Sequence, residues 1–356
     1  MDKKISAVSY AVTFAGCYLG AGYVSGQELW QFFGNFGFKG ILGFILTLAL
    51  LFFFGVILLF LAKRESIEEL DVVIAGDNIP WLKNTVAITE IVLLFGIFVI
   101  MAAGAGALIN QISGIPKIVG CLVFCIAVAV IGIKGIDGMV SAFSFIVPAL
   151  VISAVIISVF SLIKGDITSL DFSAHKSDNI LINNPLISSF TYLSYNFFGS
   201  IGILLPFAKL IERKKTVIFG TALGCLFLFL IAIGILLSLF LSPHSITSAM
   251  PMLYLASNIN SFVGYIYAFL LLLGMFGTSL SSLIAIINFF EKKNYKKAPK
   301  KIPLIILLSL LAFIGSFAGF GNLIGTIYPI FGYFGFFALF GLLYNYIKSK
   351  KKKPLR

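Results

Sequence analysis

Ten long apolar segments, separated by short polar ones, make up most of this sequence. A helix needs about 20 predominantly apolar residues to cross a bilayer, and each segment is close to or above that length. The segments therefore predict an all-α integral membrane protein with ten transmembrane helices. The predicted helices cover residues 5–34, 38–62, 84–109, 116–133, 139–163, 185–208, 216–241, 262–290, 303–320 and 324–347.

The composition of the chain supports this class. Of its 356 residues, 60% are hydrophobic and 11% are charged, whereas soluble domains have about 45–50% apolar and about 25% charged residues. A soluble enzyme, a nucleic-acid-binding protein and a disordered chain are excluded. The sequence also contains no phosphate-binding loop, zinc motif or catalytic triad, so neither enzyme activity nor an organic cofactor is expected.

The positions of the basic residues predict the orientation in the membrane. With the N-terminus in the cytoplasm, all but four of the 26 lysines and arginines fall in segments predicted to be cytoplasmic. The four on the outside are Lys39, Lys117, Lys164 and Lys176. Because cytoplasmic loops carry an excess of Lys and Arg, we expect a multi-pass protein of the cell membrane with both termini in the cytoplasm.

A long polar segment divides the chain into two halves. Residues 164–184 form this external connection, which leaves five predicted helices in 1–163 and five in 185–347, followed by a basic cytoplasmic tail at 348–356. Because five is an odd number, the second half enters the membrane from the opposite side. This arrangement is typical of a 5+5 inverted-topology repeat.

The first helix of each half has an unusual concentration of glycine and polar residues. In the first half, glycine recurs at Gly16, Gly20, Gly22 and Gly26, and the polar residues Ser25, Gln27 and Glu28 follow Gly22 directly; in the second half, Ser194, Tyr195, Asn196, Gly199, Ser200 and Gly202 fall at mid-membrane. Glycine spacing of this kind also serves tight helix packing, but polar groups inside lipid must face protein or water. We therefore expect both helices to be interrupted, a pattern that indicates the binding site of a transporter.

These two segments also resemble a known family. Ala15-Gly16 followed by Gly20-Ala21-Gly22 resembles the A-G-x-x-x-G-x-G run of sodium-coupled amino-acid transporters, and Phe197-Phe198-Gly199-Ser200 resembles the segment that carries their aromatic gate. Over nearly its whole length the chain resembles the amino acid–polyamine–cation superfamily with the LeuT fold, and within it the YkvI-like membrane proteins.

The resemblance implies a substrate site on these two helices. Its residues are Gly20, Ala21, Gly22, Ser25, Tyr195, Asn196, Phe198 and Gly199. The backbone amides of Ala21 and Gly22 would meet a substrate carboxylate, and Phe198 would cover the substrate from the outside.

The resemblance also implies a sodium site. Its ligands would be the carbonyl groups of Gly16 and Leu19 together with Thr278, Ser281 and Ser282 in segment 262–290; Thr278 and Ser279 form a rival pair of hydroxyls. Alternatively, these hydroxyls bond only the carbonyl one turn back, as often happens in membrane helices. Tyr23 stands where the relatives place a sodium-binding asparagine, so a second sodium site is not expected.

The sequence thus predicts a secondary active transporter of a small solute, an amino acid in the first instance, that works by sodium symport and alternating access. The expected partners are this solute and the lipid bilayer. One alternative is a proton-coupled or uncoupled permease in which Glu28 carries the coupling proton, because intramembrane acids are functional by default; Glu90, nearer the cytoplasmic end of its helix, is the weaker candidate. A channel or a solute sensor of the same fold also remains open.

Overall fold

The computed structural model describes residues 5–67, 69–76, 80–134, 139–166, 168, 170–175, 179–211, 213–292 and 300–352. Within these ranges the chain is helical and contains no β-strand, in agreement with the predicted all-α class. The longer helices are α1 (Ala7–Gly16), α4 (Gly37–Glu65), α6 (Pro80–Ser113), α7 (Lys117–Lys134), α8 (Met139–Lys164), α9 (Pro185–Leu204), α11 (Lys214–Phe240), α12 (Pro251–Ile259), α13 (Ser261–Lys292), α14 (Lys301–Gly315) and α15 (Phe320–Lys352). The shorter ones are α2 (Ala21–Val24), α3 (Gln27–Phe32), α5 (Leu70–Ala75), α10 (Phe207–Leu210), η1 (Gly34–Phe36), η3 (Ile180–Ile182), η4 (Pro243–Thr247) and η5 (Ser316–Ala318).

Each of the ten predicted segments coincides with a helix or a run of short helices. In the described part of the chain, eight helical segments are long and apolar enough to cross a membrane. The two predicted segments outside this set are the first, which is divided among α1, α2 and α3, and the sixth, which is mainly α9. That these two also cross the membrane, and that the halves are related by an inverted repeat, stay predictions.

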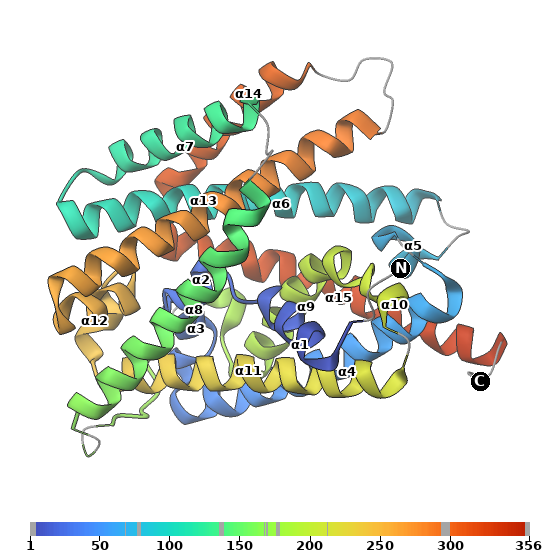
Figure 1. Ribbon diagram of the computed structural model, residues 1–356, viewed down its shortest axis with the longest axis horizontal. Helices are drawn as coiled ribbons and strands as arrows, with labels where there is room; N and C mark the ends of the chain where they lie inside the picture. The colour runs from blue at the N-terminus through green and yellow to red at the C-terminus, as the bar shows by residue number, and fades with distance from the viewer. Residues whose placement is uncertain are drawn as a thin grey trace.

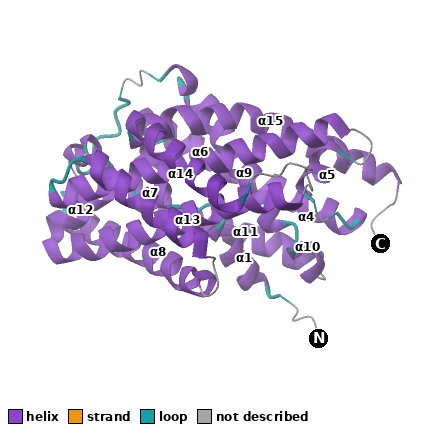
Figure 2. Cartoon of the chain, turned by 90° about the horizontal axis from the view of Figure 1, so that it is seen from above, coloured by secondary structure: helices purple, strands orange, loops and turns teal. Residues whose placement is uncertain are grey.

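The short helices of the first segment lie at the centre of the molecule. In Figure 1, α6, α7, α13 and α14 form the upper part and α4 and α11 the lower edge, while α1, α2, α3 and α9 lie between them. Helix α1 packs on α11, and α9 packs on α15 and α4. In both Figures 1 and 2, α12 lies at one end of the molecule and α5 and α10 lie at the other.

The first segment is interrupted, as its glycines predicted. Helix α1 begins at the N-cap Ser6, whose hydroxyl accepts from the Ser9 amide, and ends at Gly16. Helix α2 starts after Gly20, whose backbone is extended (φ −86°, ψ 171°). Helix α3 follows Gly26, which has a left-handed conformation (φ 82°) that an L-residue with a side chain adopts only at a cost. The chain therefore changes direction twice within this segment.

The predicted interruption of the sixth segment at mid-membrane is wrong. Helix α9 runs without a break from Pro185 to Leu204, through all the polar residues that suggested unwinding. The reason is that these side chains bond their own helix: the Ser194 hydroxyl donates to the Phe190 carbonyl (2.7 Å) and the Asn196 amide to the Tyr192 carbonyl (3.1 Å). The break comes at Pro206 instead, which precedes α10 and lacks the backbone N–H that a continuing helix needs.

At the C-terminus, the structure differs from the predicted division of the chain, which gave residues 348–356 to a separate basic tail. Helix α15 continues to Lys352, so residues 348–352 extend a helix and do not form a separate tail; residues 353–356 lie outside the described part of the chain. The predicted connection at 164–184 includes η3, and its Lys176 also lies outside the described residues. The division into repeats 1–163 and 185–347 stays a prediction.

Candidate functional site

A buried carboxyl group lies at the break in the first segment. Glu28, in the first turn of α3, has only 5% of its surface exposed. Its Oε1 accepts a hydrogen bond of 2.5 Å from the Tyr195 hydroxyl of α9. Its Oε2 lies so close to Gly22 of α2 that a Cβ atom built on that glycine would be 2.5 Å away. The side chain therefore joins α2, α3 and α9 at one point.

Aromatic rings surround this carboxyl group. The Tyr195 ring stacks on Tyr328 of α15, with centroids 4.5 Å apart and planes 8° apart. Tyr192 and Phe32 contact the Tyr195 ring at centroid distances of 5.4 and 5.7 Å. The Tyr192 hydroxyl lies beside Glu28 but is buried without a hydrogen-bond partner in the described part of the chain. Four rings from α3, α9 and α15 thus form an aromatic wall around Glu28: Phe32, Tyr192, Tyr195 and Tyr328.

Helix α2 is held on both sides by tyrosine hydroxyls. Tyr23 donates to the Leu228 carbonyl of α11 (2.7 Å), and Tyr267 of α13 donates to the Val24 carbonyl (2.6 Å). The Ser25 hydroxyl donates to the Gly22 carbonyl (2.8 Å). The bonds from Tyr267 and Ser25 satisfy backbone carbonyls of the interrupted segment, which is how non-helical backbone is tolerated at membrane depth.

Open space adjoins the break on the side away from Phe32. A Cβ atom built on Gly16, Gly20 or Gly202 would meet no heavy atom within 4 Å, and one on Gly199 would meet only Leu93, at 3.9 Å. The Tyr18 and Ser200 hydroxyls hydrogen-bond across this region at 3.0 Å, so the glycines of the two segments lie near one another. Gly20 lies two residues before Gly22, which Oε2 of Glu28 approaches.

The structure brings together only part of the predicted substrate site. Gly22 and Tyr195 meet at Glu28, and Ser25 and Asn196 are hydrogen-bonded within their own segments. Phe198 is buried and lies between Tyr195 and Ser200 along α9. Because Ser188 donates to the Phe32 carbonyl at the start of the same helix, Phe198 lies on the side of Glu28 away from Phe32. Substrate contacts of Gly20, Ala21, Phe198 and Gly199 stay predictions.

The hydroxyls of the predicted sodium site on α13 differ in their surroundings. Thr278 donates to the Gly274 carbonyl one turn back (2.9 Å), Ser281 is exposed, and Ser282 is buried. Ser279, from the rival pair, is fully buried, and its hydroxyl has no partner among the described residues. In that part of the chain, none of the four hydrogen-bonds the carbonyl of Gly16 or Leu19, so the sodium site stays a prediction.

Sequence reasoning missed two members of the aromatic wall, Tyr192 and Tyr328. Tyr192 lies one turn before Tyr195, so the period of α9 could have placed both on one face. Tyr328 is 300 residues from Glu28 in the sequence, and no local pattern around it indicates that α15 packs against α9 there.

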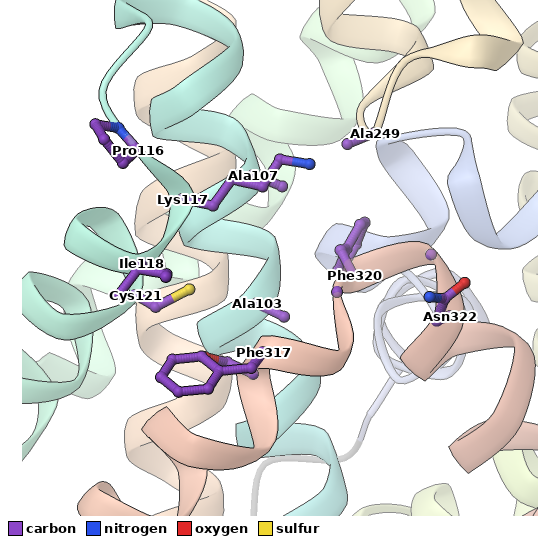
Figure 3. A pocket seen from close by; sticks show the side chains of 13 residues that line it. Ala103, Ala107, Pro116, Lys117, Ile118, Cys121, Ala249, Phe317, Phe320 and Asn322 are labelled. Carbon is purple, nitrogen blue, oxygen red and sulfur yellow. The ribbon is translucent and has the colours of Figure 1, made fainter.

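A cavity of about 650 Å³ lies toward the end of the molecule that holds α12. Figure 3 shows Lys117 of α7 and Asn322 of α15 on different helices around it, with Ala103 and Ala107 of α6. The buried Phe320 also lines it, and next to Phe320, Gly321 accepts a hydrogen bond from Gln31 of α3 (2.8 Å). The start of α15 therefore separates this cavity from the helix that carries Glu28.

The comparisons with known proteins place the chain among membrane proteins. It is 27% identical over 305 residues to the uncharacterized membrane protein YkvI of Bacillus subtilis, an alignment that covers 84% of each chain. It is also 29% identical over 148 residues to the uncharacterized protein YyaD of the same organism, over 41% of this chain and 42% of YyaD. No family model matches the sequence.

One solved structure fixes the fold. The crystal structure of MhsT in complex with L-phenylalanine matches the whole of this chain and 94% of its own chain, with a TM-score of 0.65 and 16% sequence identity. Together with the similarity to YkvI, this match confirms the resemblance drawn from the glycine motifs. The chain is similar to the membrane protein YkvI and has the LeuT fold.

Proposed function

We propose that the chain is a secondary active transporter that carries a small solute across the cell membrane by alternating access. The observation that carries this proposal is the buried Glu28 at the break between α2 and α3, joined to α9 by Tyr195 and next to open space at Gly20. Interrupted helices at membrane depth mark binding sites in transporters. An intramembrane carboxyl group at such a break is functional by default.

The topology of this transporter is ten crossings with both termini in the cytoplasm. The supporting observations are the eight apolar helical segments and the excess of basic residues on one side. Cysteines introduced at Lys39 and Lys164 should react with an impermeant maleimide added to intact cells, and cysteines at Lys214 and Lys350 should not. Labelling of both pairs from outside would contradict the ten-helix topology.

The solute class is amino acids, and the coupling ion is sodium. The fold of MhsT, whose crystal structure contains L-phenylalanine, supports the first part. The buried hydroxyls of Ser279 and Ser282 on α13 support the second, because oxygen ligands suit a hard cation. Tyr267 ties α13 to the interrupted segment at Val24, which brings that helix to the break.

A proton-coupled or uncoupled permease is the second candidate, and one observation favours it. The Glu28 carboxyl group is buried and forms no ion pair among the described residues, so a proton on Glu28 would neutralise a group that is otherwise costly to bury. The pH dependence of uptake by Glu28→Gln separates this candidate from sodium symport. Sodium-independent uptake that loses its pH dependence in the variant favours the proton.

Uptake into proteoliposomes tests the proposal. Purified protein should accumulate labelled amino acids only when an inward sodium gradient is imposed, and Ser282→Ala and Ser279→Ala should weaken this sodium dependence. Ser309→Ala on α14 is the matched control, since it removes another buried serine hydroxyl without a partner among the described residues from a different helix. Saturable uptake that ignores sodium would remove the symport mechanism, and non-saturating ion conductance would remove the transporter.

A further inference from the structure

We propose that the central site recognises the ammonium group of its solute through Glu28 and the tyrosines around it, so that primary amines are its substrate class and a carboxylate on the solute is dispensable. The inference rests on the proposed transport function and names the group of the solute that the site recognises. The family resemblance implied that the backbone at Gly22 meets a substrate carboxylate; here the ammonium group of the solute takes that place.

The first argument is that the Glu28 carboxylate has no counter-charge. It is 5% exposed, and no lysine, arginine or histidine among the described residues forms an ion pair with it. A carboxylate offers about four lone-pair sites; Tyr195 donates to one of its oxygens, and the Tyr192 and Asn196 side chains lie beside it, but all three groups are uncharged. A buried charge is costly unless a proton neutralises it or an opposite charge pairs with it, and a cationic ligand provides that pairing.

The second argument concerns the space beside Gly22. Oε2 of Glu28 already occupies the position next to the Cα atom of that glycine, so a substrate carboxylate there would place two negative charges in contact. Helix α2 is a single turn of four residues, too short to offset this repulsion with an aligned backbone dipole. The place that the resemblance gives to an anion therefore favours a cation here.

The third argument is the chemistry of the wall. The rings of Tyr195 and Tyr328 stack on each other, so a cation that contacts the outer face of either ring is attracted to it. Tyr192 is 1% exposed, and its buried hydroxyl has no partner in the described chain, although it lies beside the carboxylate. An ammonium group carries three N–H donors, which suit the two acceptors that Glu28 Oε2 and the Tyr192 oxygen offer.

The fourth argument is access. Gly20 lies two residues from Gly22, and a Cβ atom placed on it would meet no heavy atom within 4 Å. The neighbouring Gly16 and Gly202 are equally open. A small solute can therefore approach Glu28 with its ammonium group first and leave its uncharged part among glycines and apolar side chains.

Matched trios of compounds test this inference. Each trio contains an amino acid, the amine that lacks its carboxylate and the acid that lacks its amino group. One trio is L-phenylalanine, 2-phenylethylamine and 3-phenylpropionate, and the full panel has one trio for each standard side chain. Binding is measured by the thermal shift of the purified full chain, since ligands of the folded state raise apparent stability. We expect at least one amine to bind within threefold of its parent amino acid, and its paired acid not to bind.

Variants connect this binding to the site. Glu28→Gln should weaken amine binding at least 30-fold, and Glu69→Gln, which makes the same change in an exposed acid at the start of α5, should leave it unchanged. Tyr192→Phe removes a hydroxyl that bonds nothing in the described part of the fold, so it should fold normally and weaken amine binding about fivefold.

Three results would overturn the inference: acids that bind where their paired amines do not, amine binding that survives Glu28→Gln in a folded variant, and no binding by any amine of the panel. Uptake of the same labelled compounds separates this failure from failure of the proposed function. Transport that requires the carboxylate would keep the transport function but show that the site recognises the carboxylate of the solute and not its ammonium group. Glu28-dependent amine binding without flux keeps the recognition and removes transport.

Discussion

At the scale of single residues, the two tyrosines of α9 near Glu28 form a natural pair for measurement. Tyr195 donates to the carboxyl group, whereas the equally buried Tyr192 hydroxyl bonds nothing in the described chain. Hydrogen bonds to charged groups contribute about 1.5–3 kcal/mol, and removing an unpartnered polar group is nearly neutral. Tyr195→Phe should therefore lower the thermal stability of the ligand-free protein in detergent, and Tyr192→Phe should not. Equal effects of the two variants would contradict the hydrogen-bond assignment.

Gly22 is the second residue at which the site can be tested. A Cβ atom there would lie 2.5 Å from Oε2 and 3.6 Å from Cδ of Glu28, so Gly22→Ala must displace the carboxyl group. We expect solute binding to fall at least tenfold while the protein still folds, because the clash is with the far end of a flexible side chain. Binding is measured by thermal shift with the best ligand of the panel. Gly202→Ala, where a Cβ atom meets nothing within 4 Å, controls for the effect of an added methyl group on folding. Wild-type binding by Gly22→Ala would contradict the close contact between Gly22 and Glu28.

At the scale of helices, apolar length and glycine content predicted most of the fold, and the chemistry of polar side chains set the limit. The break at Gly20 and Gly26 was predictable, because these positions have an extended and a left-handed backbone. The continuity of α9 was not predicted, because it depends on Ser194 and Asn196 bonding carbonyls of their own helix. Glu28 was identified as an intramembrane acid, but its contact with Tyr195 and the stack on Tyr328 depend on packing between helices distant in sequence.

The turn at Gly26 sets the direction of α3 and therefore the position of Glu28. Its φ of 82° costs an L-residue roughly 1–2 kcal/mol, and a Cβ atom would press on Met252 at 3.1 Å and Leu239 at 3.2 Å. Gly26→Ala should lower stability by more than Gly114→Ala, which has a φ of 72° and open space around it. Thermal unfolding in detergent gives the comparison. Equal losses would mean that backbone strain alone matters and that packing against α11 and α12 does not hold the turn.

At the scale of the whole molecule, side chains tie several elements together at the end opposite α12. Lys63 at the end of α4 donates to the Ile211 carbonyl after α10 (2.7 Å). Asn345 of α15 donates to the carbonyls of Val73 and Ile74 in α5 (2.9 and 3.1 Å), and Ser349 donates to Glu65 (2.7 Å). Because the charge pattern predicts that this end is cytoplasmic, loosening these bonds should favour states of alternating access that are open to the cytoplasm.

The native cysteines report on that opening without any engineering. Cys17 lies at the break after α1 and is half-buried, while Cys121, Cys125 and Cys225 are buried, so a maleimide should label Cys17 first. Asn345→Ala removes two hydrogen bonds between α15 and α5 and should increase the rate of Cys17 labelling in inside-out vesicles severalfold. Asn322→Ala is the matched control, because this asparagine of α15 bonds only the Ala318 carbonyl beside it (3.0 Å) among the described residues. Because a bound solute would occupy the space beside the break, a saturating ligand should slow the labelling of Cys17 in both variants. Equal labelling rates for Asn345→Ala and the control would show that the hydrogen bonds between α15 and α5 do not hold the cytoplasmic end closed.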